Sequence, residues 1–239
     1  MRLDNKQALV TGGTDGIGLE IARQLKAKGA RVAVVGRRAE LLDRAQGEGL
    51  EGLPGDLSSA EGCAALVAAW GDRPLDLLVN NAGASPPFEA TGDPQLAGTD
   101  RVIFLNLNAP LHLMAAFRDR LAAAKGTIVN VTSGLAIAPR AGGPVYCATK
   151  AGLRSLTLGL RPTYRALGIH LMEALPPVVD TAMTAARPAK GKMSASACAA
   201  EIVAAIEQDR DEANVGMVKL LRRVYSVSPA LARRIMLRF

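Results

Sequence analysis

Short apolar runs of strand length alternate with longer segments of helical periodicity along most of the chain. The runs that we predict to be buried parallel strands are Gln7–Val10, Arg31–Val35, Asp76–Val79, Thr127–Val131 and Ile169–Ala174, with a weaker one near Gly49–Pro54. The predicted helices between them are Ile17–Lys28, Glu40–Ala45, Ser59–Trp70, Pro94–Ala124 and Pro144–Ala166. Unbroken alternation of this kind is typical of an α/β fold with one doubly wound, mainly parallel sheet flanked by helices.

A single domain is the expected organisation. No linker rich in proline, glycine or serine divides the 239 residues, so we expect one domain over residues 1–239. Pro162 lies late in the last of the predicted helices, which it should kink or end because proline lacks an amide N–H.

The positive charge of the chain is concentrated near its C-terminus. Residues 213–239 contain six of the 29 basic residues and no acid, and the remaining 23 basic residues nearly balance the 22 acidic ones. Aromatic residues make up only 3% of the chain, so a surface for stacking nucleic-acid bases is not expected. We therefore predict no nucleic-acid partner.

Several other classes of protein are excluded by what the sequence lacks. No apolar run approaches the roughly 20 residues that a membrane-spanning helix needs. A strand-like run already begins at Gln7, which leaves no room for a signal peptide, and a cytoplasmic protein is expected. Cys63, Cys147 and Cys198 show no CxxC spacing, so neither a disulfide framework nor a metal site is expected.

A glycine-rich turn follows the first predicted strand directly and leads into a helix. Its sequence is Thr11-Gly-Gly-Thr-Asp-Gly-Ile-Gly18. Glycines permit a tight turn and close approach of the backbone to a pyrophosphate, whose charge suits a helix N-terminus. The strand–turn–helix context therefore predicts a dinucleotide site, although an ordinary turn between strand and helix has the same pattern.

Two arginines follow the second predicted strand, in Gly36-Arg37-Arg38. In dinucleotide folds an acid near this place bonds the ribose 2′-hydroxyl, whereas an arginine accommodates a 2′-phosphate. The acid is absent, so NADP(H) is favoured over NAD(H), with solvated surface arginines as the alternative. Asp15 counts against NADP(H), because it places a negative charge inside the phosphate loop.

Three residues further along the chain have the chemistry of proton transfer. Ser133 follows the fifth strand, and Tyr146 and Lys150 are four residues apart, so on a helix they share one face. An ammonium beside a phenol stabilises the phenolate and lowers the pKa of the tyrosine.

These motifs together resemble the classical short-chain dehydrogenase/reductase family over about residues 5 to 185. The resemblance is carried by Thr11–Gly18, Asn80-Asn-Ala-Gly83, Ser133 and Tyr146-Cys-Ala-Thr-Lys150. It implies a single Rossmann domain and catalytic roles for Ser133, Tyr146, Lys150 and Asn106. The cofactor-binding positions that we predict are Gly12, Asp15, Gly16, Ile17, Gly18, Arg37, Arg38, Asp56, Leu57, Asn80, Ala82, Gly83, Tyr146, Lys150, Val179 and Thr181.

A narrower resemblance to the DltE-like oxidoreductase subgroup lies in Leu175–Met183 and Asn214–Leu221. The family usually has Pro-Gly where this chain has Pro176-Pro177, which changes the loop path. Residues from about 182 to 200 form the expected substrate-loop region. Its Arg187, Lys190 and Lys192 could favour an anionic substrate, but a solvated loop is the interpretation that we prefer.

The family implies an NADP(H)-dependent oxidoreductase that interconverts a carbonyl and an alcohol, with Tyr146 as general acid/base. The alternative is a cofactor-binding regulatory protein with little turnover. A homodimer built from Leu107–Ala123 and Pro144–Tyr164 is expected. The basic C-terminal helix at about 228–239 could dock on its own core, on a second subunit or on an anionic membrane, the last not being favoured.

Overall fold

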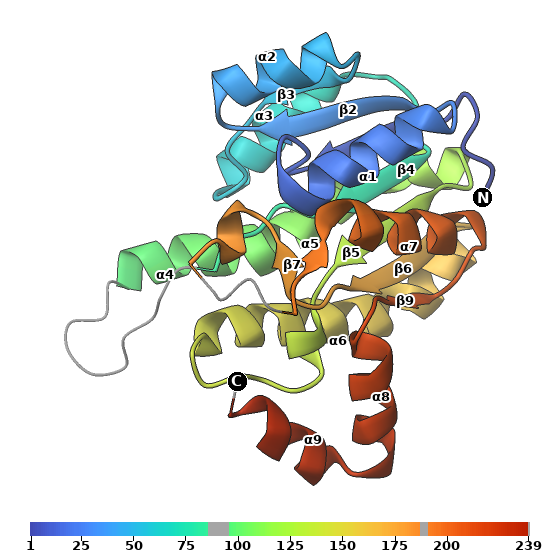
Figure 1. The fold of residues 1–239 in the computed structure, drawn as a ribbon. Helices are drawn as coiled ribbons and strands as arrows, with labels where there is room; N and C mark the ends of the chain where they lie inside the picture. Colours follow the sequence, from blue (N-terminus) through green and yellow to red (C-terminus); the bar gives the residue numbers. More distant parts are fainter. Residues whose placement is uncertain (86–95, 187–190, 239) are drawn as a thin grey trace.

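The computed structural model describes residues 1–85, 96–186 and 191–238. In this part of the chain the central sheet has seven parallel strands in the order β3-β2-β1-β4-β5-β6-β9 (Figure 1). Their bounds are Gln7–Thr11 (β1), Arg31–Gly36 (β2), Glu51–Pro54 (β3), Leu77–Asn80 (β4), Thr127–Val131 (β5), His170–Leu175 (β6) and Glu212–Asn214 (β9). The predicted doubly wound α/β fold is confirmed.

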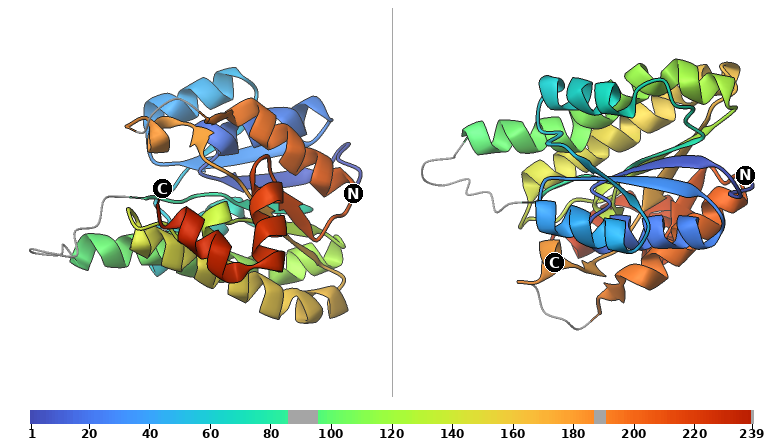
Figure 2. Two further views of the ribbon diagram at one scale, coloured as in Figure 1. Left: turned by 60° about the horizontal axis from the view of Figure 1, so that its bottom comes forward. Right: turned by 90° about the horizontal axis from the view of Figure 1, so that it is seen from above.

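Helices cover both faces of the sheet (Figure 2). One layer holds α1 (Gly16–Ala27), α2 (Ala39–Gly47) and α7 (Ala195–Glu207), and the other holds α3 (Ala60–Trp70), α5 (Ala109–Ala123) and α6 (Pro144–Ala166). Ile21 and Ile202 are buried in the first layer, and Trp70 meets Phe117 edge to face in the second. Because both faces are covered, a central strand such as β5 is buried along its whole length, and three of its five residues are apolar.

The order of the strands places a topological switch point between β1 and β4. β1 pairs with β2 on one side and with β4 on the other, and the chain leaves β1 for α1 in one layer and passes from β4 to α5 in the other. Ligands of open α/β sheets bind at such a switch point.

Two expectations about helices need correction. The helix predicted over Pro94–Ala124 begins outside the described residues, and from Leu96 it consists of α4 (Leu96–Ile103), a π-helical turn η1 (Phe104–Asn108) and α5. Of the two effects expected of Pro162, a kink or an end of the helix, the end does not occur, because α6 continues to Ala166. Pro162 is exposed, and so is Leu158, whose carbonyl loses its helical partner, so water can satisfy that carbonyl.

The C-terminal third holds elements that the apolar pattern did not predict. In the region expected to form the substrate loop, a 3₁₀ turn η3 (Ala182–Thr184) follows the short strand β7 (Val179–Asp180). The strand β8 (Met193–Ser194) pairs with β7, and α7 begins at Ala195. The strand β9 was also missed, because its sequence Glu-Ala-Asn is not apolar.

Two last helices, α8 (Val218–Val227) and α9 (Pro229–Met236), project beyond one end of the sheet (Figure 1). The predicted basic helix corresponds to α9, and the Ser228 hydroxyl caps it by accepting from the Leu231 amide at 3.2 Å. Among the described helices, none combines the length and the apolar character needed to cross a bilayer.

Candidate functional site

The glycine-rich turn forms a tight loop between β1 and α1. Gly12 and Gly16 have φ of +61° and +55°, which favour glycine. A Cβ added at Gly18 would lie 2.4 Å from the Gly12 carbonyl oxygen, so the loop packs closely on the first turn of α1. Ile17 packs against the core of this layer. The loop therefore leaves a cradle of bare backbone at a helix N-terminus, which fits a pyrophosphate.

Asp15 is the N-cap of α1, and its carboxylate accepts from the Gly16 amide at 2.7 Å. The same carboxylate lies 3.4 Å from the Arg38 guanidinium, and both side chains are more than half exposed. The negative charge that counted against NADP(H) is thus partly balanced by one of the two predicted arginines.

The loop after β4 is fastened to the glycine turn by Asn81, a residue that the sequence reasoning missed. Its side chain donates to the carbonyls of Thr11 and Gly12 at 3.0 and 3.2 Å. The Thr11 hydroxyl in turn accepts from the amides of Asn81 and Ala82, both at 3.0 Å. Asn81 stands inside the quoted Asn80–Gly83 motif, and its position in that motif is the signal that could have identified it.

The side chain of Asn80 lies inside the sheet rather than in this loop. It is buried and donates to the Asn130 side chain at 2.8 Å, and Asn130 donates to the Thr157 hydroxyl at 2.9 Å. These hydrogen bonds join β4, β5 and α6, so Asn80 stabilises the elements on which the site is built.

Arg37 and Asp56 lie at the rim where β2 and β3 end. Burial opposes ionisation of Asp56, but hydrogen bonds from Ser58 and the charges of Arg37 and Arg101 outweigh it and lower its pKa. Arg101 donates to the Asp56 carboxylate at 3.1 Å, and Leu57 beside it is buried. The rim holds an ionised carboxylate among cations, as expected for a segment that contacts polar groups of a ligand.

Lys150 and Tyr146 come together on α6. The Lys150 ammonium is 4% exposed, donates to the Val131 carbonyl at 2.8 Å and lies 5.8 Å from the centre of the Tyr146 ring. Burial lowers the pKa of Lys150 to about 8. The ammonium is still protonated at neutral pH, and it can stabilise negative charge on the phenol in a site of low polarity.

Ser133 follows β5 and caps the 3₁₀ turn η2 (Gly134–Ala136), where its hydroxyl accepts from the Leu135 amide at 3.1 Å. The turn η2 packs against α6, which brings Ser133 to the helix that carries Tyr146. The Ser133 hydroxyl proton is not used in that contact and can be donated to a substrate oxygen.

Asn106 lies in the π-helical turn η1 and is fully buried. Its side chain accepts from the Ala84 amide and donates to the Ala84 carbonyl, both at 2.9 Å, and donates to the Thr149 hydroxyl at 3.1 Å. A Cβ at Gly83 would lie 3.1 Å from the Asn106 oxygen and 3.5 Å from the Lys150 ammonium. Asn106 thus holds the Gly83–Ala84 backbone beside Lys150.

The segment after β6 returns to the glycine turn. Val179 is buried in β7, and a Cβ added at Gly16 would lie 3.0 Å from a methyl group of Thr181. Gly16 and Thr181, both predicted cofactor-binding positions, are therefore neighbours in space.

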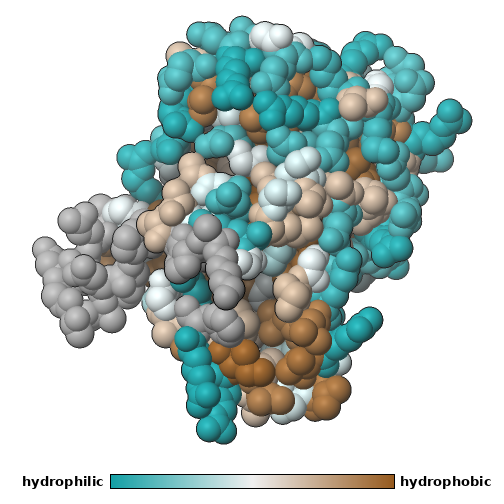
Figure 3. Space-filling view, in the orientation of Figure 1, coloured by the Kyte–Doolittle hydropathy of each residue, from teal (hydrophilic) through white to brown (hydrophobic). Residues whose placement is uncertain are grey.

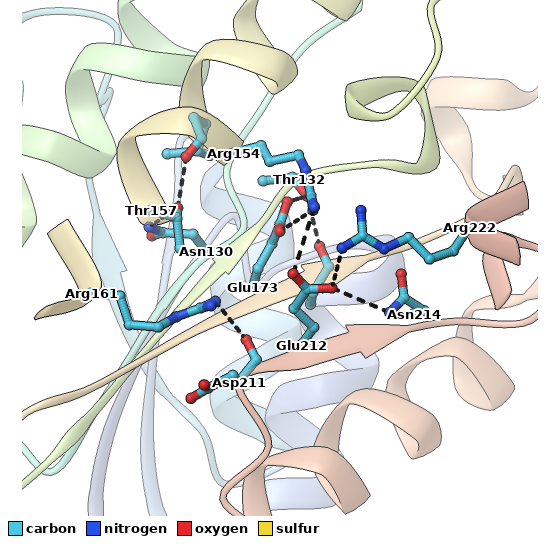
Figure 4. A network of polar contacts seen from close by, with 12 residues as sticks. Asn130, Thr132, Arg154, Thr157, Arg161, Glu173, Asp211, Glu212, Asn214 and Arg222 are labelled. Carbon is cyan, nitrogen blue, oxygen red and sulfur yellow. Dashed lines mark hydrogen bonds and ion pairs between the residues drawn. The ribbon is translucent and has the colours of Figure 1, made fainter. Parts of the chain in front are cut away.

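A network of charged and polar side chains joins β6, α6, β9 and α8 (Figure 4). The Glu173 carboxylate on β6 is fully buried, accepts from the Thr132 hydroxyl at 2.6 Å and pairs closely with Arg154 of α6. Arg154 also lies 3.6 Å from Glu212 of β9, which lies 3.6 Å from Arg222 of α8. Burial raises the pKa of Glu173, and the Thr132 hydrogen bond and the Arg154 charge oppose this rise. The network joins the site to the C-terminal elements.

The model of the short chain dehydrogenase family matches residues 6–192. An uncharacterized oxidoreductase DltE of Bacillus subtilis (strain 168) is 39% identical over 193 residues, which cover 77% of this chain and 75% of that protein.

Two solved structures share the fold. A short chain dehydrogenase of Burkholderia cenocepacia J2315 in complex with NADP is 25% identical and superposes with a TM-score of 0.89 over 99% of each chain. A short chain dehydrogenase/reductase of Burkholderia phymatum in complex with NAD is 20% identical, with a TM-score of 0.82 over 95% of this chain and 96% of that one.

Proposed function

Since the chain belongs to the short-chain dehydrogenase/reductase family, we propose that this oxidoreductase uses NADP(H) to interconvert a carbonyl and an alcohol, with Tyr146 as general acid/base. The observation that carries the proposal is the buried Lys150 ammonium beside the Tyr146 ring, at the carboxyl edge of the sheet. Family membership supports the reaction class, and this pair supports the identity of the proton donor.

In the proposed mechanism the cofactor supplies or accepts a hydride when bound, and the protein handles the proton. Tyr146 donates its phenolic proton to the carbonyl oxygen of the substrate, and Lys150 stabilises the phenolate that remains. Ser133 donates a hydrogen bond to the same substrate oxygen and so orients the carbonyl.

Asn106 takes a narrower role than the family resemblance implied. Both of its side-chain N–H donors and one acceptor site are occupied by Ala84 and Thr149. A single lone pair of Oδ1 remains for a water that could link Lys150 to solvent. Its main contribution in this proposal is to position the Gly83–Ala84 backbone.

NADP(H) is the cofactor that we propose, because Arg37 directly follows β2, where dinucleotide folds use an arginine to accommodate a 2′-phosphate. Among the described residues Arg37 has no ion pair, whereas Arg38 lies within 4.0 Å of both Asp15 and Glu40. The relative from Burkholderia cenocepacia, solved with NADP, supports this choice, and the one from Burkholderia phymatum, solved with NAD, shows that the fold accommodates either dinucleotide.

Arg37→Asp is expected to raise the Kd for NADPH about tenfold or more and to shift preference toward NADH. A charge-assisted contact to phosphate contributes roughly 1.5–3 kcal/mol, and an acid at this place can bond the ribose hydroxyls instead. Fluorescence titration of both cofactors measures the effect. Arg44→Asp, which makes the same charge change on the neighbouring helix α2, serves as control. Equal affinity of the wild-type protein for NADH and NADPH would show that the assignment is wrong.

An assay of turnover distinguishes the proposed oxidoreductase from a cofactor-binding regulatory protein. The loss of NADPH absorbance is measured with a panel of ketones and aldehydes, and the reverse reaction with the corresponding alcohols. Tight NADPH binding without turnover on any of them would favour the cofactor-binding regulatory protein.

A homodimer through η1, α5 and α6 is part of the proposal. A shallow groove between these helices is lined by Leu107, Leu111, Leu156 and Leu160, and Leu111 and Leu158 are 40% and 38% exposed. Burial of such leucines favours pairing of copies. Light scattering at micromolar concentration should give twice the mass of 24.9 kDa, and a monomer would contradict the proposal.

A further inference from the structure

The helices α8 and α9 carry an apolar surface that their packing leaves exposed. We call it the C-terminal patch and define it by the exposed apolar residues Met217, Leu220, Val227, Leu231, Ile235 and Leu237. Val227 and Met217 are 87% and 67% exposed. Met217, Leu220 and Val227 recur at helical spacing, so they form one stripe along α8. Figure 3 shows apolar residues gathered over the lower part of the molecule, where Figure 1 places α8 and α9.

Another side of this helix pair packs its apolar residues on the body of the protein. Val218 is buried against Ile137 and Leu175, with Leu221 and Tyr225 packed around them. In α9, Ala232 is fully buried. The packing of α8 and α9 on the body of the protein therefore accounts for one side of the helix pair. The C-terminal patch has no partner among the described residues.

Arginines without an ion pair among the described residues lie on the same two helices, and Arg234 and Arg238 adjoin Leu231 and Ile235 of the patch. Within the described ranges, Arg223, Arg233, Arg234 and Arg238 form no ion pair, while Lys219 pairs with Glu201 at 2.7 Å and Arg222 lies 3.6 Å from Glu212. Leu231, Arg234, Ile235 and Arg238 line one shallow hollow together. The sequence from residue 213 onward holds no acid that could neutralise these charges.

We propose that the C-terminal patch rests on the surface of an anionic lipid bilayer. Apolar side chains flanked by arginines match the boundary between acyl chains and negatively charged headgroups, because the long side chains reach outward to the phosphates. A second copy of the chain is a poor occupant, because a symmetric contact would bring the same arginines face to face. The contact is peripheral, and it goes beyond the proposed function because it depends on no residue of the candidate site.

Sedimentation with vesicles tests the proposal on the full chain. Wild-type protein should pellet with vesicles of phosphatidylcholine containing phosphatidylserine, stay in solution with pure phosphatidylcholine, and be released as salt rises. Replacing Arg223, Arg233, Arg234 and Arg238 together by Gln should weaken binding by about a hundredfold or more, because each cation near the surface contributes roughly fivefold. Val227→Ser with Leu231→Ser should weaken it as well, because their apolar contact is lost.

The matched control variant removes the same number of positive charges from other parts of the surface. Arg2, Arg31, Lys125 and Arg210 are exposed and, among the described residues, form no side-chain ion pair, so their joint replacement by Gln changes net charge equally. This control should keep binding. Absence of wild-type binding, or an equal loss in the control, would overturn the proposal. So would a mass in light scattering that falls when Val227 and Leu231 are replaced by Ser, since that would identify a second copy as the occupant of the patch.

Discussion

Tyr146→Phe is expected to lower kcat by about 10²–10⁴-fold while the Kd for NADPH changes little. The substitution removes the hydroxyl that donates the proton in the proposed mechanism and keeps the ring, which lies 5.8 Å from the Lys150 ammonium. Steady-state kinetics on the best substrate and fluorescence titration of NADPH measure the two effects separately.

The same helix supplies a control for this experiment. Tyr164, also on α6, is buried far from the site, so Tyr164→Phe removes an equivalent hydroxyl without touching the proposed chemistry. It should keep kcat within about twofold. If Tyr146→Phe retained more than about a tenth of the wild-type kcat, another group would have to be the acid.

Arg154→Met is expected to lower the free energy of unfolding by about 3–5 kcal/mol. Glu173 is fully buried, and removal of Arg154 leaves its carboxylate without its main counter-charge. Denaturant unfolding measures the loss. The neighbouring pair of Arg165 and Asp211 is 68% and 45% exposed, so Arg165→Met should cost less than about 1 kcal/mol.

The pH dependence of this loss follows from the direction of the pKa shift. Burial raises the pKa of Glu173 in the folded protein, and loss of Arg154 raises it further, so the ionised form opposes folding. The penalty is smallest at acid pH, where Glu173 is protonated, and grows as pH rises through its folded pKa. Combining Arg154→Met with Glu173→Gln should recover part of the loss at neutral pH. If the free energy of unfolding of the single variant Arg154→Met stayed within about 1 kcal/mol of the wild-type value, Arg154 would not be the counter-charge that offsets the burial of Glu173.

The sheet could be predicted because its central strands are buried on both faces. Each of them is rich in apolar residues, and the helices between them have clear periodicity, so their order alone indicates a doubly wound sheet. Tyr146 and Lys150 were expected to share a helical face from their spacing, and α6 carries both. The catalytic and cofactor roles of these residues stay predictions.

The sequence pattern could not predict those features of the fold and of the site that depend on contacts between residues far apart in the chain. The strand β9 has no apolar sequence, and it is held by its pairing with β6 and by Arg154, which lies close to Glu212. Helical periodicity continues on both sides of η1, so the sequence does not reveal the extra residue of this π-helical turn. The structure reveals it together with the hydrogen bond that Asn106 donates to the Ala84 carbonyl. Asn81 joins two loops that are 69 or more residues apart in sequence.

The bonds that Asn81 and Thr11 make have an entropic consequence for ligand binding. Ordering the backbone of one residue costs about 1–2 kcal/mol, and a loop that becomes ordered only around its ligand subtracts that cost from the affinity. Here the glycine turn is already fixed to the loop after β4 by four hydrogen bonds. The proposed dinucleotide would therefore meet a preorganised loop, and little of its contact free energy at the pyrophosphate would be offset by ordering of the glycine turn.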